Sequence, residues 1–270
     1  MIFIKDIGEP IIQNYRTLKK RHNDNSKSEE IFIAEGEKVV LKLLSSSLNI
    51  KSIFCTEDFY QDHKEAIISR VYPNSNIYIA DKSLMSEIIG YKLHSGVMAE
   101  ALTPRMSGLN DFNGNIIACN SIIDTENIGS IVRNAAAFGF NNIFLDNASS
   151  SPYLRRAVRV SLGNIFGMNY RITNSFISEL ITLKNEYGYK IISAEITENS
   201  YPIHHIDFDS KFVLIFGSEG KGISNEVLEI SDFIVHIPII EQVGSINVAA
   251  AAGIFMYDIN NSRSRMCIKI

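Results

Sequence analysis

One glycine-rich segment of the sequence has the composition of a ligand-binding loop. The apolar run Val213–Phe216 leads into Gly217–Gly222, which has three glycines in six residues. Glycine lets a backbone approach a ligand closely, and open α/β sheets bind ligands at the carboxyl ends of their strands. Glu219 lies inside the turn, where its carboxylate could orient a partner. The spacing matches neither a phosphate-binding P-loop nor GxGxxG, and a plain strand-to-helix connection is the alternative.

A second segment places a permanent cation on a helix of mostly small apolar residues. Residues 122–140 predict an apolar strand end followed by a helix, with Asp124 and Asn127 able to accept from free N–H groups at its start. Arg133 follows within the helix. It is either a surface arginine paired with Asp124 or Glu126, or a functional group.

A third segment combines a strand, a loop and a long helix. The strand ends at Pro238, and Ser245 or Asn247 starts the helix. An apolar loop with exposed backbone groups would suit a flat heterocycle, and its walls are Ile237, Ile239 and Ile246. A capped helix that packs on the sheet is the alternative, and the segment alone favours it.

The elements that must position these segments alternate between helices and strands. Before residue 103 the patterns predict helices over 10–22, 38–45, 58–70 and 84–89, and strands over 31–34, 50–55, 77–80 and 96–102. After residue 114 they predict strands over 116–119, 143–145, 190–194, 212–216 and 233–237. Short apolar strands separated by helices indicate an α/β fold with a mostly parallel sheet, buried on both faces.

A segment rich in turn-forming residues divides the chain. Residues 103–114 contain proline, two glycines, serine and asparagine, a composition typical of a linker. We therefore expect an N-terminal domain over residues 1–102, a linker over 103–114 and a second domain over 115–270.

Composition and charge exclude several classes of protein. The chain has 270 residues, of which 46% are hydrophobic and 21% charged, as in a globular protein. Cys55, Cys119 and Cys267 are far apart, so neither a disulfide framework nor a metal site is expected. The absence of a signal peptide or a long apolar run predicts a cytoplasmic protein with no membrane association. The net charge of −4 alone argues against nucleic acid, although binding depends on local patches.

Together, the three segments resemble motifs 1, 2 and 3 of the SpoU-type (TrmH-like) RNA 2′-O-ribose methyltransferases of the SPOUT superfamily, in order, spacing and residue type. The matching residues are Asn127-x-Gly129-x-x-x-Arg133, Phe216-Gly217-x-Glu219-Gly220-x-Gly222, and Ile237-Pro238 followed by Ser245-Ile246-Asn247-Val248. Residues 158–163 resemble a further family block. Residues 15–102 more loosely resemble the small substrate-binding domain that often precedes the catalytic domain.

The resemblance implies a catalytic α/β domain with a deep trefoil knot, after a small α/β substrate-binding domain. It implies S-adenosylmethionine as cofactor, held by Gly217, Ile237 and Ile246, and methyl transfer to a ribose 2′-hydroxyl. It also implies a catalytic site of Asn127, Arg133, Glu219, Ser245 and Asn247. Because a guanidinium hardly ever deprotonates, we expect Arg133 to bind a phosphate and stabilise the developing alkoxide, held in place by Glu219 and Asn127.

The resemblance also implies an RNA partner and a homodimer formed through the knotted domain and the last helix. The additional N-terminal domain favours ribosomal RNA over transfer RNA. Two basic clusters are candidates for RNA contact, with a solvated face as the alternative for each. They consist of Arg16, Lys19, Lys20 and Arg21, and of Arg155, Arg156 and Arg159.

Three alternatives remain at this point. The chain could methylate tRNA, or it could be a non-catalytic RNA-binding or assembly protein on the same fold. A small-molecule enzyme on a generic α/β sheet would explain the glycine loop but not three motifs in register. Ser218, Gly244, Ile246 and Ala249 depart from the common family residues without removing a catalytic group.

Overall fold

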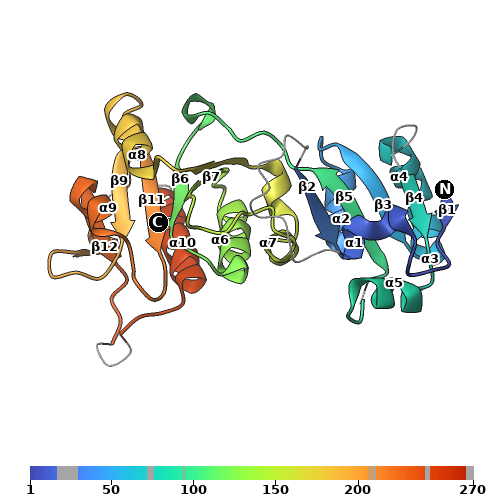
Figure 1. Cartoon of the computed structure of the whole chain (residues 1–270). Coiled ribbons are helices and arrows are strands. Elements are labelled where there is room, and N and C mark those ends of the chain that lie inside the picture. Colours follow the sequence, from blue (N-terminus) through green and yellow to red (C-terminus); the bar gives the residue numbers. More distant parts are fainter. Residues whose placement is uncertain are drawn as a thin grey trace. The chain divides into compact units, whose positions relative to one another are not determined.

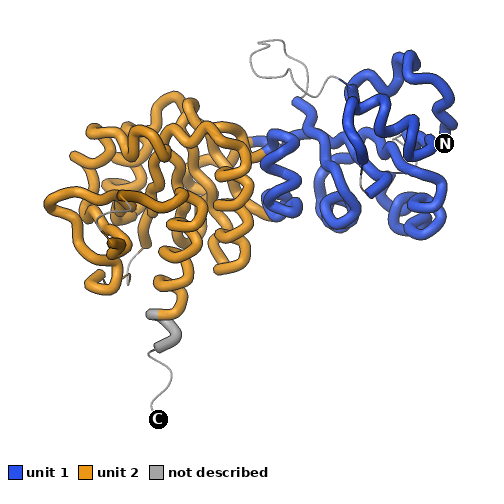
Figure 2. Tube along the Cα trace, turned by 90° about the horizontal axis from the view of Figure 1, so that it is seen from below, with its two compact units in different colours: residues 1–105, 153–166 blue, residues 106–152, 167–270 orange. Residues whose placement is uncertain are grey.

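The computed structural model describes residues 1–16, 30–71, 76–93, 95–206, 208, 211–240 and 244–265, with side chains up to residue 261. The chain forms two compact units (Figure 2). The first comprises residues 1–105 and 153–166, and the second residues 106–152 and 167–270.

The first unit is built on a mixed five-stranded sheet with the order β1-β4-β3-β5-β2 (Figure 1). Strands β1, β3 and β4 are parallel, and β5 runs antiparallel to both β3 and β2. The strands are β1 (Ile2–Phe3), β2 (Ile31–Glu35), β3 (Ile50–Cys55), β4 (Asn76–Ile79) and β5 (Val97–Leu102). The helices from residues 1–105 are η1 (Pro10–Ile12), α1 (Gln13–Arg16), α2 (Glu37–Leu44), α3 (Glu57–Asp62), α4 (Lys64–Val71) and α5 (Lys82–Ile89).

Two helices of this unit differ from the sequence prediction. The single helix expected over 58–70 is interrupted at His63, which leaves helical geometry with φ −122° and ψ 19°. The helix expected over 10–22 begins as a 3-10 turn at Pro10 and continues as α1 to Arg16. Residues 17–22 lie outside the described part of the chain.

A segment from the middle of the chain packs against the first unit's sheet. The ring of Phe32 on β2 lies 5.1 Å from Tyr153 and 5.4 Å from Phe166. The Arg155 guanidinium, on helix α7 (Arg155–Val160), lies 2.8 Å from the Glu35 carboxylate at the end of β2. Aromatic contacts and this ion pair therefore place residues 153–166 in the first unit, and not in the domain over 115–270 that is expected from the sequence.

The second unit contains a seven-stranded sheet whose neighbouring strands are all parallel, in the order β10-β12-β9-β11-β6-β7-β8. The strands are β6 (Ile116–Asn120), β7 (Asn142–Asp146), β8 (Asn169–Thr173), β9 (Lys190–Ala194), β10 (Tyr201–Pro202), β11 (Phe212–Gly217) and β12 (Phe233–His236). The predicted parallel α/β sheet is confirmed. The edge strands β8 and β10 were not predicted, because β8 is only half apolar and β10 has two residues.

Helices cover both faces of this sheet (Figure 1). Val213 and Ile215 of β11 belong to the core cluster that contains side chains of α8 (Phe176–Asn185) and α9 (Asn225–Ile230). The alternate residue Phe216 faces Phe255 of α10 (Val248–Arg265), with ring centroids 5.7 Å apart. Helix α10 in turn packs against α6 (Thr125–Ala137). Burial on both faces explains the continuous apolar character of the strands.

Much of the predicted linker is part of the second unit. The Ser107 amide donates to the Tyr170 carbonyl on β8 (2.8 Å). The Ser107 carbonyl accepts from the Arg171 guanidinium, also on β8 (3.1 Å). Phe112, beyond the 3-10 helix η2 (Leu109–Asp111), is buried in the core. The expected linker over 103–114 is therefore largely fixed by an edge strand and a buried aromatic ring.

Two of the three cysteines lie within the described residues. Cys55 and Cys119 are buried free thiols, and burial raises the pKa of Cys55 to about 12. Cys267 lies outside the described residues. In the described ranges, no group of three or more His, Cys, Asp or Glu side chains could hold a metal ion. No helix there is long and apolar enough to cross a membrane.

A partly buried ion pair on the edge strand β8 predicts an acid-sensitive contribution to stability. Arg171 binds Glu179 through two 2.6 Å hydrogen bonds, and these lower the pKa of the Glu179 carboxyl. Because the folded pKa is depressed, this stabilisation is present above the unfolded value of about 4.3 and is lost as the pH falls through the folded pKa. We expect Glu179→Gln to reduce the free energy of unfolding at pH 7 by about 1–2 kcal/mol.

Urea unfolding at pH 7 and in acid measures this effect. The gap between wild type and Glu179→Gln should shrink as the pH falls below about 4. Glu186→Gln, an exposed residue just after α8, should change stability by less than about 0.5 kcal/mol at either pH. A gap that does not depend on pH would contradict the assignment.

Candidate functional site

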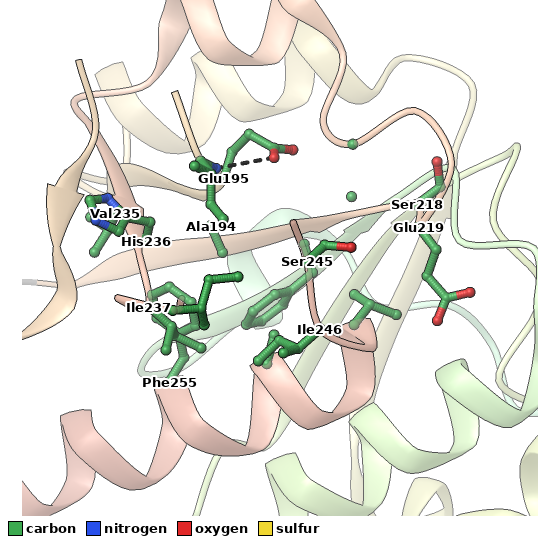
Figure 3. Close-up of a pocket in the computed structure, with 17 residues that line it drawn as sticks. Ala194, Glu195, Ser218, Glu219, Val235, His236, Ile237, Ser245, Ile246 and Phe255 are labelled. Atoms are coloured by element: carbon green, nitrogen blue, oxygen red, sulfur yellow. Dashed lines mark hydrogen bonds between the residues drawn. The ribbon is translucent and has the colours of Figure 1, made fainter. Parts of the chain in front are cut away.

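Two of the three chemically suggestive segments, residues 213–222 and 233–258, line one cavity in the second unit. The cavity has a volume of about 170 Å³ and lies at the carboxyl ends of β9, β11 and β12 (Figure 3). Five of the eight predicted catalytic and cofactor-binding residues line it, namely Gly217, Glu219, Ile237, Ser245 and Ile246. Its position agrees with the rule that parallel α/β sheets bind ligands beyond the carboxyl ends of their strands.

A tight turn forms one wall of this cavity. The Gly222 amide donates to the Ser218 carbonyl (2.8 Å), and the Ser218 amide donates to the Gly222 carbonyl (3.2 Å). A Cβ added at Gly217 would lie 2.2 Å from the backbone carbon of Gly222, so position 217 has no room for a side chain. Gly222 itself has φ +67°, a left-handed conformation that favours glycine. Two of the three glycines are thus required by close backbone approach and backbone conformation.

The opposite walls of the cavity are apolar. Ile237, Ile239 and Ile246 come from the chain between β12 and α10, and Phe216 and Phe255 complete the surface. Figure 3 shows the labelled members of this group gathered below the strand ends. An apolar slot beside exposed backbone groups is the usual construction of a small-molecule site.

Beside the cavity, three polar side chains from the three segments form one hydrogen-bonded cluster. The Asn247 amide donates to the Glu219 carboxylate (2.6 Å) and to Asn127 Oδ1 (2.9 Å). Asn127 Nδ2 also donates to Glu219, at 3.2 Å. The Asn127–Glu219–Asn247 cluster therefore joins residues that are up to 120 positions apart in the sequence.

The beginnings of the two helices explain how this cluster is placed. Asp124 caps α6 by accepting from the Glu126 amide (2.8 Å), so Asn127 is not a cap as the sequence allowed, and its amide is directed to Glu219. Asn247 caps α10 by accepting from the Ala249 amide (2.9 Å). Its side-chain oxygen is used by its own helix, and its nitrogen by the cluster.

Close packing of α6 and α10 brings these two helix starts together. Asn134 Nδ2 donates to the Ala249 carbonyl at 2.9 Å. A Cβ at Gly253 would lie only 3.1 Å from the same nitrogen. The glycine at position 253 therefore allows the helices to approach closely, which a longer side chain would prevent.

The Arg133 side chain is exposed on α6. Within the described ranges, no residue accepts a hydrogen bond from its guanidinium or pairs with it. It is thus neither paired with Asp124 or Glu126, nor held by Glu219 and Asn127 as the sequence analysis expected. Glu219 and Asn127 instead form hydrogen bonds with each other and with Asn247.

A buried carboxylate that the sequence analysis missed orders the loops that lead into the site. Asp146, at the end of β7, accepts from the Ser121 amide (2.9 Å), Asn120 Nδ2 (2.9 Å) and the Ser149 hydroxyl (2.6 Å). Asn120 Oδ1 accepts from the Ser224 amide at 2.8 Å. The network fixes the chain before α6 and before α9. In the sequence, Asp146 could have been noticed as a polar residue directly after an apolar strand.

The candidate RNA-binding residues have different surroundings. Arg16 donates to the Glu9 carbonyl (2.7 Å), and Lys19, Lys20 and Arg21 lie outside the described residues. The Arg155 side chain is 16% exposed and bound to Glu35, so it is not available as part of an RNA-contacting surface. Arg159, 46% exposed and 3.6 Å from Glu35, and the exposed Arg156 remain accessible.

Comparison with known proteins gives the family. Residues 114–257 match the family described as the SpoU rRNA Methylase family. The chain belongs to this family. An uncharacterised tRNA/rRNA methyltransferase of Mycobacterium bovis is 30% identical to this SpoU family member over 265 residues, covering 94% of the chain and 89% of the relative.

Solved structures share the fold of this SpoU family member over nearly its whole length. An AdoMet-bound rRNA methyltransferase from Sinorhizobium meliloti has a TM-score of 0.83 at 23% identity, covering 99% of this chain and 98% of the other. A structure described as an RNA 2′-O ribose methyltransferase has a TM-score of 0.77 at 17% identity, covering 98% of this chain and all of the other. At these identities the likeness shows the fold.

Two further polar residues of the cavity were not predicted from the sequence. Glu195 follows β9, and His236 ends β12, where its Nδ1 lies 2.9 Å from the Ser200 hydroxyl. Strand β9 lies next to β11, and β12 lies next to β9, so both residues are at the same edge of the sheet as the glycine turn. Strand order, which the sequence does not show, makes them part of the site.

Two glycine substitutions test whether position 217 must lack a side chain. We expect Gly217→Ala to reduce the free energy of unfolding by more than about 2 kcal/mol, because its Cβ would collide with backbone. Gly220→Ala is the matched control, since nothing lies within 4 Å of its added Cβ, and should stay within about 0.5 kcal/mol. Urea unfolding measures both variants, and equal stabilities would contradict the proposed turn geometry.

Proposed function

We propose that this protein transfers a methyl group from S-adenosylmethionine to a ribose 2′-hydroxyl of structured RNA, with ribosomal RNA as the favoured substrate. The observation that carries the proposal is the convergence of the three motifs. The Asn127–Glu219–Asn247 cluster lies beside a cavity lined by Gly217, Ile237 and Ile246. The reported rRNA and 2′-O ribose methyltransferase folds support it.

The cavity has the groups that S-adenosylmethionine requires. Its apolar walls suit the adenine ring, while Gly217 and Gly222 bring the backbone of the glycine turn to the cavity wall. We assign Gly217, Ile237 and Ile246 to cofactor binding. When bound, the cofactor supplies an electrophilic methyl group on a sulfonium.

The residues of the chain then have to orient and activate a weak nucleophile. A ribose hydroxyl must be held in line with the methyl group and must lose its proton. We propose that Arg133 binds the phosphate next to the target ribose and stabilises the developing alkoxide, since its guanidinium is exposed and has two parallel donors. The Asn127–Glu219–Asn247 cluster and the Ser245 hydroxyl position the ribose.

Exposed residues of the first unit and of α10 are our candidates for contacts with RNA and with a second copy of the chain. The exposed Arg156 and Arg159, with Lys19, Lys20 and Arg21, are our candidates for RNA binding. Tyr257 and Ile254 of α10 are 57% and 42% exposed, and we propose that they belong to a homodimer interface, which sedimentation velocity tests. A trefoil knot in the second unit and a cytoplasmic location, where ribosomal RNA is found, complete the proposal.

Methylation of tRNA is the second candidate, since the relative from Mycobacterium bovis is described as a tRNA/rRNA methyltransferase. Calorimetry with S-adenosylmethionine, followed by mass mapping of ribose methylation in RNA from a deletion strain, tests both. A missing methyl group in rRNA would support the proposal, and one in tRNA the alternative. Absence of cofactor binding and of any lost methyl group would favour a non-catalytic RNA-binding protein.

Arginine variants test the role of Arg133. We expect Arg133→Ala to lower kcat/KM for RNA methylation by about 100-fold or more, with cofactor affinity changed by less than about 2-fold. Arg133→Lys should lose most of the activity as well, because an ammonium cannot donate the two parallel hydrogen bonds of a guanidinium. Arg105→Ala, an exposed arginine of the first unit, is the control. High activity in Arg133→Lys would contradict a bidentate role.

The salt dependence of RNA binding tests the proposed basic surface. The logarithm of the affinity should fall linearly with the logarithm of the salt concentration, because phosphate contacts release counterions. The Arg156→Ala/Arg159→Ala double variant should reduce the slope by about 2, and Lys64→Ala, an exposed lysine of α4, should leave it unchanged. A flat slope for the wild type would contradict electrostatic RNA recognition.

A further inference from the structure

Glu195 is a charged residue of the cavity to which the motifs assign no role. It follows β9 directly and lines the cavity (Figure 3). Its backbone amide donates to the Val235 carbonyl at 3.1 Å, which fixes the residue against β12. The side chain is half-buried, and its position follows from the sheet rather than from a mobile surface loop.

The Glu195 carboxylate is held in one orientation but retains acceptor capacity. Oε2 accepts from the Ile223 amide (2.9 Å), and Oε1 from the Ile196 amide (3.1 Å). A Cβ at Gly222 would lie 2.3 Å from Oε2, so the glycine turn closes directly over the carboxylate. Each carboxylate oxygen can accept a second hydrogen bond, which leaves one open acceptor on each.

The surroundings do not neutralise this carboxylate. Across the described residues, no lysine, arginine or histidine forms an ion pair with Glu195. Its neighbours along the cavity wall include Ile196 and Val235. An acceptor-only group beside an apolar slot is best satisfied by donors from the ligand that fills the slot.

We propose that Glu195 binds the ribose of S-adenosylmethionine by accepting hydrogen bonds from its 2′- and 3′-hydroxyls; this inference rests on the proposed function. Two adjacent neutral hydroxyls match two open acceptors on one carboxylate. An acidic residue beside a glycine-rich turn, at the carboxyl edge of a parallel sheet, recognises ribose hydroxyls in nucleotide-binding α/β folds by the same chemistry. Glu195 thereby makes the site selective for a ribonucleoside donor.

A double-mutant cycle between residue and ligand tests this contact. Calorimetry with the intact protein measures the affinities of S-adenosylhomocysteine and of its 2′,3′-dideoxyribose analogue for wild type and Glu195→Ala. We expect Glu195→Ala to weaken S-adenosylhomocysteine by about 10- to 100-fold, as for hydrogen bonds to a charged group. The dideoxy analogue, which lacks the hydroxyls, should lose less than about 3-fold.

Control variants separate ligand binding from loop support. Glu195→Gln keeps an oxygen for the Ile223 amide and should preserve the thermal unfolding midpoint while still weakening S-adenosylhomocysteine. Glu198→Gln, an exposed residue of the same segment, should change nothing. Equal losses for both ligands in Glu195→Ala would overturn the proposal and leave Glu195 as a support of the glycine turn.

A third ligand tests whether Glu195 binds the ribose or the amino-acid part of the cofactor. 5′-Methylthioadenosine keeps the ribose but lacks the ammonium group, so we expect Glu195→Ala to weaken it as strongly as S-adenosylhomocysteine. An unchanged affinity would assign the carboxylate to the ammonium and overturn the proposal. Failure of the wild type to bind any of these ligands would instead remove the proposed function and this inference with it.

Discussion

The hydrogen bonds of Asn247 are the constraint on which the site depends. One side-chain amide caps α10 through its oxygen and binds both Glu219 and Asn127 through its nitrogen. These groups belong to three segments that are widely separated in the sequence. Because the cap also determines where α10 begins, the helix and the polar cluster cannot be placed independently. The stability of the last helix and the geometry of the site are therefore coupled.

The parallel sheet provides the rigid support for this coupling. Its strands end at one edge, where Asp146 and Asn120 order the loops before α6 and α9 through buried hydrogen bonds. At the same edge, the close approach of Gly217 to Gly222 forms a tight turn with no room for a side chain at position 217.

The net charge of the protein does not describe which basic side chains are available to RNA. The net charge is −4, and the structure removes Arg155 from the basic surface because it is bound to Glu35. Among the described residues, the exposed arginines are then Arg105, Arg133, Arg156 and Arg159. With so little positive charge, we expect RNA recognition to depend on particular phosphate contacts rather than on a broad attractive field.

The sequence by itself determined the parallel α/β sheet and the identity of the three motifs, because apolar strands and glycine spacing are local properties. It also predicted that Gly217, Ile237 and Ile246 belong to one site, and all three line the same cavity. It could not show that residues 153–166 pack on β2, that Asn127 faces Glu219 rather than its own helix, or that Glu195 lines the cavity. Those facts depend on strand order and on contacts between distant residues, and only the tertiary structure decides them.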